Sequence, residues 1–178
     1  VIKVIWGTDF DDYITHENGH FFLKRAEEIV DGDLLKYVVE GGAYIRKHFW
    51  GKYPELLEMV ATKTDKELEK MRVGGHDPVK VYAAFKEAVE TKGKPTVILT
   101  RTIKGYGLGE AGEGRNITHQ QKKLNQEELL YFRDRFDIPL TDKQSQSTLF
   151  YKPRANSKEA IYLLKHRKKL GGFVPERN

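Results

Sequence analysis

The alternation of apolar and polar positions is clearest in the middle of the chain. Asp77 is a good helix N-cap and Pro78 a good first helical residue, and apolar side chains at helical spacing follow them. The predicted inward face of this helix consists of Val81, Tyr82, Phe85, Ala88 and Val89. Gly93 ends the helix, and the apolar run at 96–100 predicts a strand covered on both faces. A helix, a tight loop and a buried strand predict an α/β fold with a mostly parallel sheet flanked by helices.

Residues 1–6 (VIKVIW) are almost wholly apolar and predict another buried strand. Further along, helices are expected to break at Gly51 and Pro54, because Pro54 suits the first turn of a helix. The predicted apolar face of that helix carries Leu57, Val60 and Ala61. Thr64 or Asp65 is expected to cap the next short helix.

The C-terminal part of the sequence predicts two more helices. The first covers 126–136, with Leu129, Leu130 and Phe136 as its expected inward residues. Residues 138–156 are expected to form a loop. Ser157 is expected to cap a final helix that ends at Gly171 and Gly172.

Composition places the chain among soluble globular proteins. Its 178 residues suffice for one domain or for part of a larger one, and no window is apolar enough to cross a membrane. The start of the chain lacks the layout of a signal peptide and there is no cysteine, so a cytoplasmic location is expected. The net charge of +5 is mild. The densest basic run, Lys165–Lys169, predicts a solvated surface, with an anionic partner as the alternative.

Five glycines lie between residues 105 and 114, directly after the predicted strand at 96–100. Ligands of open α/β sheets bind beyond the carboxyl ends of the strands, so this loop is a candidate binding site. Lys104 could supply a point charge to a phosphate there, and the glycines suit a lid. The loop matches neither complete glycine-rich phosphate motif, so a simple turn remains the alternative.

His119 lies at the far end of this loop, close in sequence to Glu113 and Arg115. From the residues alone, His119 is either a catalytic group or an ordinary surface histidine. No spacing of histidine, cysteine or paired carboxylates predicts a metal site held by this chain alone. His76 stands beside the helix cap Asp77, which already explains that motif.

Three segments closely resemble the homodimeric type of pyruvate dehydrogenase, the decarboxylating first component of the bacterial complex. They are GGAYIRKHFWGKYPELLEMV, FRDRFDIPL and RVGGHDPVKVYAAFKEAVETKGKPTVILTRTIKGYGLGEAGEGRNITHQQKKLN. More loosely, G-H-D-P, the helix, the strand, T-I-x-G-Y-G and a later histidine resemble transketolases, which share the thiamine diphosphate fold. The resemblance runs over nearly the whole chain and is weakest at 8–30 and 141–157.

The resemblance implies a role for each candidate residue. Lys104 matches the family lysine that contacts the cofactor diphosphate, and the mobile active-centre loop corresponds to about 105–123. His119 matches the histidine that supports acetyl transfer to the lipoyl group of the second component. Glu113 and Arg115 match charged residues that order the loop and dock this partner.

The same resemblance implies thiamine diphosphate and Mg²⁺ as cofactors, with the metal ligands upstream and outside this chain. The expected partners are pyruvate, the lipoyl domain and core of the dihydrolipoamide acetyltransferase, and a second copy in a homodimer; nucleic acid and membrane are not expected. Residues 1–140 would be the carboxyl-terminal half of a diphosphate-binding, transketolase-like domain, and 141–178 would lead towards the next domain. The chain would be a fragment, and inactive by itself.

Two alternatives stay open at this point. One is a fragment of a transketolase-like enzyme. The GAYIRKHF and RDRF segments argue against it, because they fit the dehydrogenase better. The other is a non-catalytic interaction module that binds anionic partners through Lys165–Lys169, which would show as strongly salt-dependent association.

Overall fold

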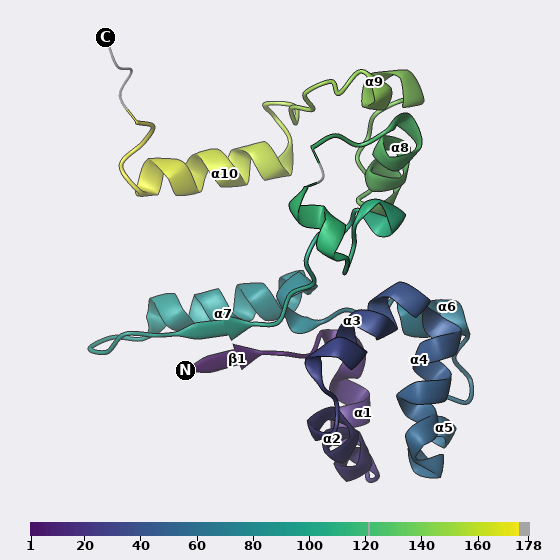
Figure 1. Cartoon of the computed structure of the whole chain (residues 1–178). Coiled ribbons are helices and arrows are strands. Elements are labelled where there is room, and N and C mark those ends of the chain that lie inside the picture. The colour runs from purple at the N-terminus through teal and green to yellow at the C-terminus, as the bar shows by residue number, and fades with distance from the viewer. Residues whose placement is uncertain (121, 175–178) are drawn as a thin grey trace. The chain divides into compact units, whose positions relative to one another are not determined.

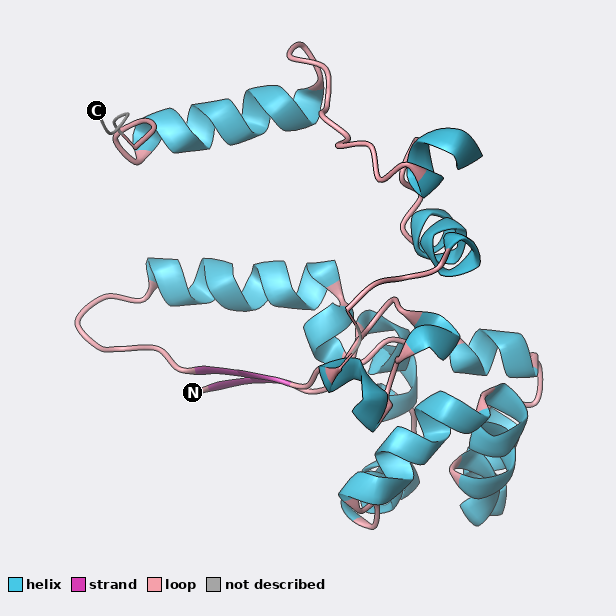
Figure 2. Ribbon diagram, turned by 45° about the horizontal axis from the view of Figure 1, so that its top comes forward, coloured by secondary structure: helices cyan, strands magenta, loops and turns pink. Residues whose placement is uncertain are grey.

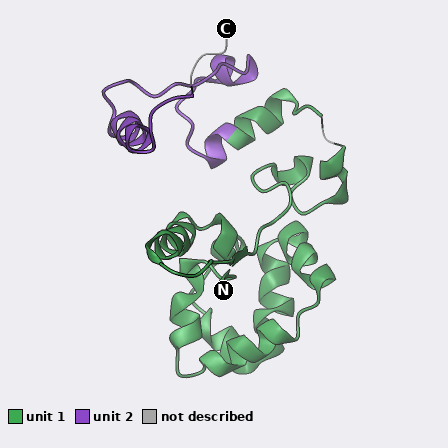
Figure 3. Cartoon of the chain, turned by 90° about the vertical axis from the view of Figure 1, so that its left-hand side faces the viewer, with its two compact units in different colours: residues 1–132 green, residues 133–178 purple. Residues whose placement is uncertain are grey.

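The computed structural model describes residues 1–120 and 122–174. The chain divides into two compact units, residues 1–132 and residues 133–178, coloured separately in Figure 3. The domain division expected from the sequence, at residue 140, concerns membership of a larger domain and stays a prediction.

A parallel pair of strands forms the sheet of the first unit. β1 (Ile2–Val4) and β2 (Ile98–Thr100) pair so that Ile2 lies opposite Ile98 and Val4 opposite Thr100. Helix α7 (Pro78–Glu90) runs alongside them, as Figure 1 shows. Both predicted strands are confirmed, although each is shorter than the apolar run that predicted it. The helix and the parallel strands confirm the α/β class.

The predicted burial of these elements is wrong in part. Leu99 on β2 is 49% exposed, so this strand is not covered on both faces. On α7 the predicted inward residues Tyr82, Phe85 and Val89 are 63%, 58% and 71% exposed, whereas Ala84 is buried. The reason is that α7 packs on β1 through its small alanine side, and the described residues supply only two strands and this one flanking helix to the sheet.

A cluster of short helices makes up the rest of the unit before the loop. Its members are η1 (Thr8–Phe10), α1 (Asp11–Thr15), α2 (Gly19–Glu27), α3 (Asp31–Glu40), α4 (Gly42–His48), η2 (Trp50–Lys52), α5 (Pro54–Met59), α6 (Asp65–Glu69) and η3 (Gly74–His76). Their aromatic side chains form the core: Phe22, Phe49 and Trp50 are almost fully buried, and the rings of Phe49 and Trp50 meet edge to face with centroids 5.0 Å apart.

Short-range signals in this cluster are confirmed. Pro54 opens α5, and Thr64 caps α6 in a reciprocal capping box with Glu67. The predicted face of α5 is partly wrong, because Leu57 is 42% exposed while its neighbour Leu56 is fully buried. That face depends on where α5 packs, which its own sequence does not determine.

Beyond the loop, α8 (Gln126–Arg135) and α10 (Lys158–Lys169), two of the cyan helices in Figure 2, confirm the two predicted C-terminal helices. The Ser157 side chain caps α10. The expectation of a continuous loop over 138–156 is wrong: it contains α9 (Asp142–Gln146), which Thr141 and Gln144 cap reciprocally. Phe136, expected to point inward, is 41% exposed. No helix within the described residues is long and apolar enough to cross a membrane.

Candidate functional site at the carboxyl ends of the strands

The segment before α7 inserts between the carboxyl ends of the two strands. The amide of Gly74 donates to the carbonyl of Ile5, and the amide of Gly75 donates to the carbonyl of Arg101, each at 2.8 Å. A Cβ on Gly75 would lie 2.3 Å from the Arg101 carbonyl oxygen, so only glycine permits this approach. Residues 73–77, here called the clasp, therefore hold both strand ends in one place.

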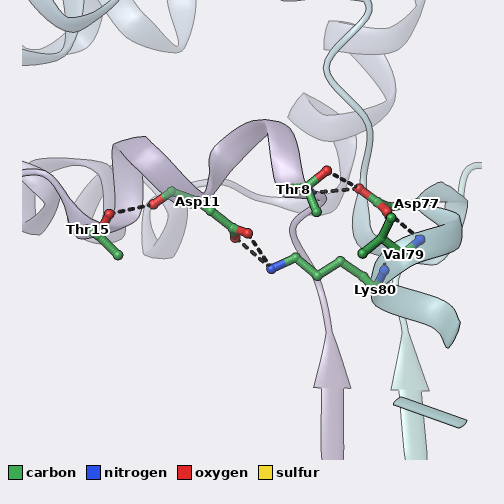
Figure 4. A network of polar contacts seen from close by, with 6 residues as sticks. All are labelled: Thr8, Asp11, Thr15, Asp77, Val79 and Lys80. Atoms are coloured by element: carbon green, nitrogen blue, oxygen red, sulfur yellow. Dashed lines mark hydrogen bonds and ion pairs between the residues drawn. The ribbon is translucent and has the colours of Figure 1, made fainter. Parts of the chain in front are cut away.

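Asp77 completes the clasp from a fully buried position (Figure 4). Its carboxylate accepts from the amide and the hydroxyl of Thr8, both at 2.7 Å, and from the amides of Val79 and Lys80 at the start of α7. Burial by itself would raise the pKa of Asp77, but these four hydrogen bonds outweigh it and lower the pKa to about 2. Asp77 is thus a structural anion that ties α7 to the end of β1.

A shallow groove of about 480 Å³ runs along β1 and α7, lined by Val4, Trp6 and Ala84 among others. The ion pair between Lys80 and Asp11, drawn in Figure 4, borders this groove; its charged atoms are 2.7 Å apart. None of the four candidate residues predicted from the sequence lines it. The groove is the uncovered side of the α7–β1 contact, and the candidate chemistry lies at the strand ends instead.

His76, the clasp residue before Asp77, reaches the loop that follows β2. Its Nε2 accepts a hydrogen bond from the amide of Ile103 at 2.7 Å. Its ring stacks on that of Tyr106, with centroids 3.7 Å apart and an interplanar angle of 6°. Lys104 stands in the chain between these two partners, and it is exposed.

The glycine-rich loop folds back on itself. Gly105 and Gly107 adopt positive φ of 68° and 90°, which turns the chain sharply after Lys104. The amide of Gly114 donates to the carbonyl of Lys104 at 2.9 Å. The half-buried Glu113 carboxylate accepts from the amides of Gly107 and Gly109, at 3.1 Å and 3.2 Å, so Glu113 closes the loop.

The second half of the loop returns to Lys104. It contains η4 (Gly109–Ala111) and η5 (Asn116–His119). The Thr118 hydroxyl donates to the carbonyls of Gly112 and Arg115, and its methyl group lies close enough to Gly105 to contact a Cβ there at 2.8 Å. His119 follows Thr118 directly and is exposed.

The four candidate residues thus lie on one folded loop at the strand ends. Lys104, Arg115 and His119 are exposed, and Glu113 is engaged with backbone amides. Their roles in binding or catalysis stay predictions. Of the loop expected at 105–123, Gln121 lies outside the described residues.

Sequence reasoning missed two residues of this region. Arg101 directly follows β2, and its guanidinium lies 5.2 Å from the centre of the Trp6 ring. Burial lowers the pKa of Arg101, against the opposite effect of Asp31, yet an arginine stays charged at neutral pH. The sequence assigns His76 to the helix entry alone, whereas the structure stacks its ring on that of Tyr106.

Within the described ranges 1–120 and 122–174, no three histidine, aspartate or glutamate side chains gather as they would to hold a metal ion. The candidate residues thus gather two exposed cations, Lys104 and Arg115, and one exposed histidine, His119, on a loop whose glycines are partly or fully buried.

Comparison with known proteins reveals close relatives over almost the entire chain. Over 177 residues, 99% of its length, it is 49% identical to the pyruvate dehydrogenase E1 component of Pseudomonas aeruginosa and 46% identical to that of Escherichia coli. The component from Mycobacterium tuberculosis is 44% identical over 181 residues. The chain is a relative of pyruvate dehydrogenase E1 components. The resemblance seen in the sequence is thereby confirmed.

The match covers the chain far better than it covers these E1 components. The chain spans 20% of the length of each of the three relatives. No family model matches the chain. The relatives' name therefore describes proteins about five times as long as the segment to which this chain corresponds.

Proposed function

We propose that the chain is part of a thiamine diphosphate-dependent pyruvate dehydrogenase of the homodimeric bacterial type. The enzyme decarboxylates pyruvate and transfers the acetyl group to the lipoyl group of the acetyltransferase component, in the cytoplasm. Residues 1–140 belong to its diphosphate-binding, transketolase-like domain, and 141–178 lead towards the next domain. The observation that carries the proposal is the 43–49% identity to E1 components over 99% of the chain.

The residues at the strand ends suit the diphosphate end of this cofactor. A diphosphate needs cations and close backbone approach, which Lys104, Arg101 and the glycines at positive φ offer beyond the carboxyl ends of parallel strands. Lys104, exposed just after β2, would hold a phosphoryl oxygen by charge. The Mg²⁺ ligands belong to residues upstream of this chain in the proposed enzyme.

Each loop residue then has a distinct part. The cofactor supplies the electron sink for decarboxylation, and the protein binds and orients the reactants and keeps water away. Glu113 holds the loop closed through the amides of Gly107 and Gly109. Arg115, exposed and cationic, meets the acceptor component.

His119 moves a proton during acetyl transfer. When the acetyl group attaches to one sulfur of the lipoyl dithiolane, the S–S bond breaks and the other sulfur leaves as a thiolate that needs a proton. The exposed imidazole of His119 can deliver this proton from the loop, because a ring nitrogen of imidazole can both carry a proton and release it.

Two partial reactions of the full-length enzyme test this function. His119→Ala is expected to leave pyruvate decarboxylation with an artificial electron acceptor nearly intact, and to slow acetylation of a free lipoyl domain by roughly 10²–10⁴-fold. Asn116→Ala, on the same turn of η5, serves as the control and should alter neither rate. Equal loss of both reactions in His119→Ala would contradict the role of His119, and absence of any decarboxylation in the parent enzyme would contradict the function itself.

A further inference from the structure

We propose that His76 is a positioning residue for Lys104, and that it sets the affinity of the enzyme for the diphosphate of its cofactor. The inference rests on the proposed function, in which Lys104 binds that diphosphate. The observation behind it is the contact of one imidazole with the chain on both sides of Lys104.

The two contacts of His76 bracket the lysine. The amide of Ile103, one residue before Lys104, donates to Nε2 at 2.7 Å, and the ring of Tyr106, two residues after it, stacks on the imidazole at 3.7 Å. A lysine ammonium sits on a flexible four-carbon stem, so the direction of its backbone decides where the charge is presented. Fixing Ile103 and Tyr106 fixes that direction.

The imidazole is itself held by the strand ends. Gly75, the residue before it, donates to the carbonyl of Arg101 at 2.8 Å, and Asp77, the residue after it, is fully buried and bonded to Thr8. The clasp thus fixes the start of the loop relative to the ends of β1 and β2. Apart from the contacts of His76 on either side of it, Lys104 is held through its backbone by the hydrogen bond from the amide of Gly114 to its carbonyl, among the described residues.

The acceptor nitrogen and the flat ring of His76 each make one of the two contacts with the loop, and substitutions can remove them one at a time. A neutral imidazole offers one acceptor nitrogen and a flat aromatic face. His76→Gln retains an acceptor at about the position of Nε2 but loses the stacking ring. His76→Phe retains the ring but leaves the Ile103 amide without this acceptor.

The experiment is a double-mutant cycle in the full-length enzyme, with the dissociation constant for thiamine diphosphate measured by titration in the presence of Mg²⁺. We expect His76→Ala to weaken binding roughly tenfold and Lys104→Met to weaken it at least as much, with kcat at saturating cofactor little changed in His76→Ala. In the Lys104→Met background, His76→Ala should have less than about a twofold further effect. His76→Gln should fall between the parent and His76→Ala.

Additive losses in the double variant would overturn the proposal, because they would mean that His76 does not act through Lys104. An unchanged affinity in both His76→Ala and His76→Gln would overturn it as well. If His76→Ala does not fold, the cycle with His76→Gln decides in its place.

If the proposed function is wrong, the same titration gives a different result. If Lys104→Met leaves the affinity unchanged, the diphosphate contact of Lys104 is refuted, and the positioning role falls with it. His48→Ala is the matched control, because the His48 ring stacks on that of Tyr44, with centroids 4.1 Å apart, within α4 of the helix cluster. It should leave the dissociation constant unchanged.

Discussion

The aromatic helix cluster and the loop after β2 are held together in opposite ways. In the cluster, large side chains such as Phe22 and Trp50 are almost fully buried against one another. In the loop, the side chains of Lys104 and His119 are exposed, and backbone amides donate to carbonyls and to the Glu113 carboxylate instead. The cluster is organised by burial, and the loop by glycine turns and backbone hydrogen bonds that leave Lys104, Arg115 and His119 exposed.

The clasp, residues 73–77, joins these two regions. Gly74 and Gly75 bond to the chain at the two strand ends, Asp77 bonds to Thr8 at the border of the cluster, and His76 contacts the loop. The buried core and the candidate site residues therefore lie in separate parts of the unit, and one short segment connects them. Substitutions should therefore separate into effects on global unfolding and effects on the loop.

The largest effect is expected in the cluster. Phe22→Ala should lower the free energy of unfolding by about 4 kcal/mol, because it removes a ring with no exposed surface and leaves a cavity. Leu23→Ala, the neighbouring position on α2, is 46% exposed and should cost less than about 1 kcal/mol. Urea unfolding of the two variants measures the difference, and similar losses at both positions would contradict a core centred on the aromatic rings.

The clasp should show an intermediate effect that depends on pH. Because the pKa of Asp77 is lowered to about 2 in the folded chain, its charge stabilises the fold above pH 4, and this stabilisation is lost as the pH falls through 2. The difference corresponds to about 2 kcal/mol. Asp77→Asn should lower stability at pH 7 by about that amount and flatten the acid limb of the stability curve.

The control for this prediction is Asp11→Asn. Asp11 pairs with Lys80 at 2.7 Å, but both side chains are substantially exposed, so the pair contributes less than about 1 kcal/mol. Chemical unfolding at pH 7, 4 and 2.5 compares the variants. An acid limb that survives in Asp77→Asn would show that other carboxylates dominate acid unfolding.

In the loop, Gly105→Ala should act locally. The residue has φ 68°, and a Cβ there would approach the Thr118 methyl group to 2.8 Å, so the folded loop becomes less stable by roughly 1–2 kcal/mol. Tryptic cleavage after Arg115 should then be about tenfold faster, while the urea midpoint hardly moves. Gly32→Ala, at an open position in α3, should leave cleavage unchanged; a large shift in the midpoint of Gly105→Ala would contradict the separation of the two regions.

The smallest effect is expected for Glu113→Gln. Glutamine can still accept from Gly107 and Gly109, but without the charge these hydrogen bonds weaken, and cleavage after Arg115 should quicken only a few-fold. Glu110→Gln, an exposed carboxylate in the same loop, should not alter the rate. An equal effect of both substitutions would mean that net charge, rather than the closure by Glu113, governs the loop.

The sequence predicted those features whose physical cause lies within a few residues. Asp77, Thr64 and Ser157 cap their helices as expected, because a cap needs only the amides two or three positions further on. The same signal was available for α9, where Thr141 precedes Gln144 by three residues, but the polar surroundings favoured a loop. Helix faces failed where the packing partner decides them, as on α7, where Ala84 rather than Phe85 is buried.

For the candidate site, too, the sequence predicts what depends on neighbouring residues but not the contacts between distant segments. Lys104 and His119 could be placed at the two ends of the glycine-rich loop from the order of elements alone, and the resemblance to pyruvate dehydrogenases supplied the roles expected of His119, Glu113 and Arg115. The contact of His76 with Ile103 spans 27 residues and depends on how the clasp fits between two strand ends. No periodicity or motif encodes such a contact, so it required the structure.

The most direct test of the separation between the two regions is hydrogen exchange on the full-length enzyme, with and without thiamine diphosphate and Mg²⁺. We expect the cofactor to slow exchange in the clasp and over residues 102–119, while amides of α2, α4 and α5 exchange at unchanged rates. Protection confined to the helix cluster, or none in the loop, would contradict the assignment of ligand chemistry to the carboxyl ends of β1 and β2.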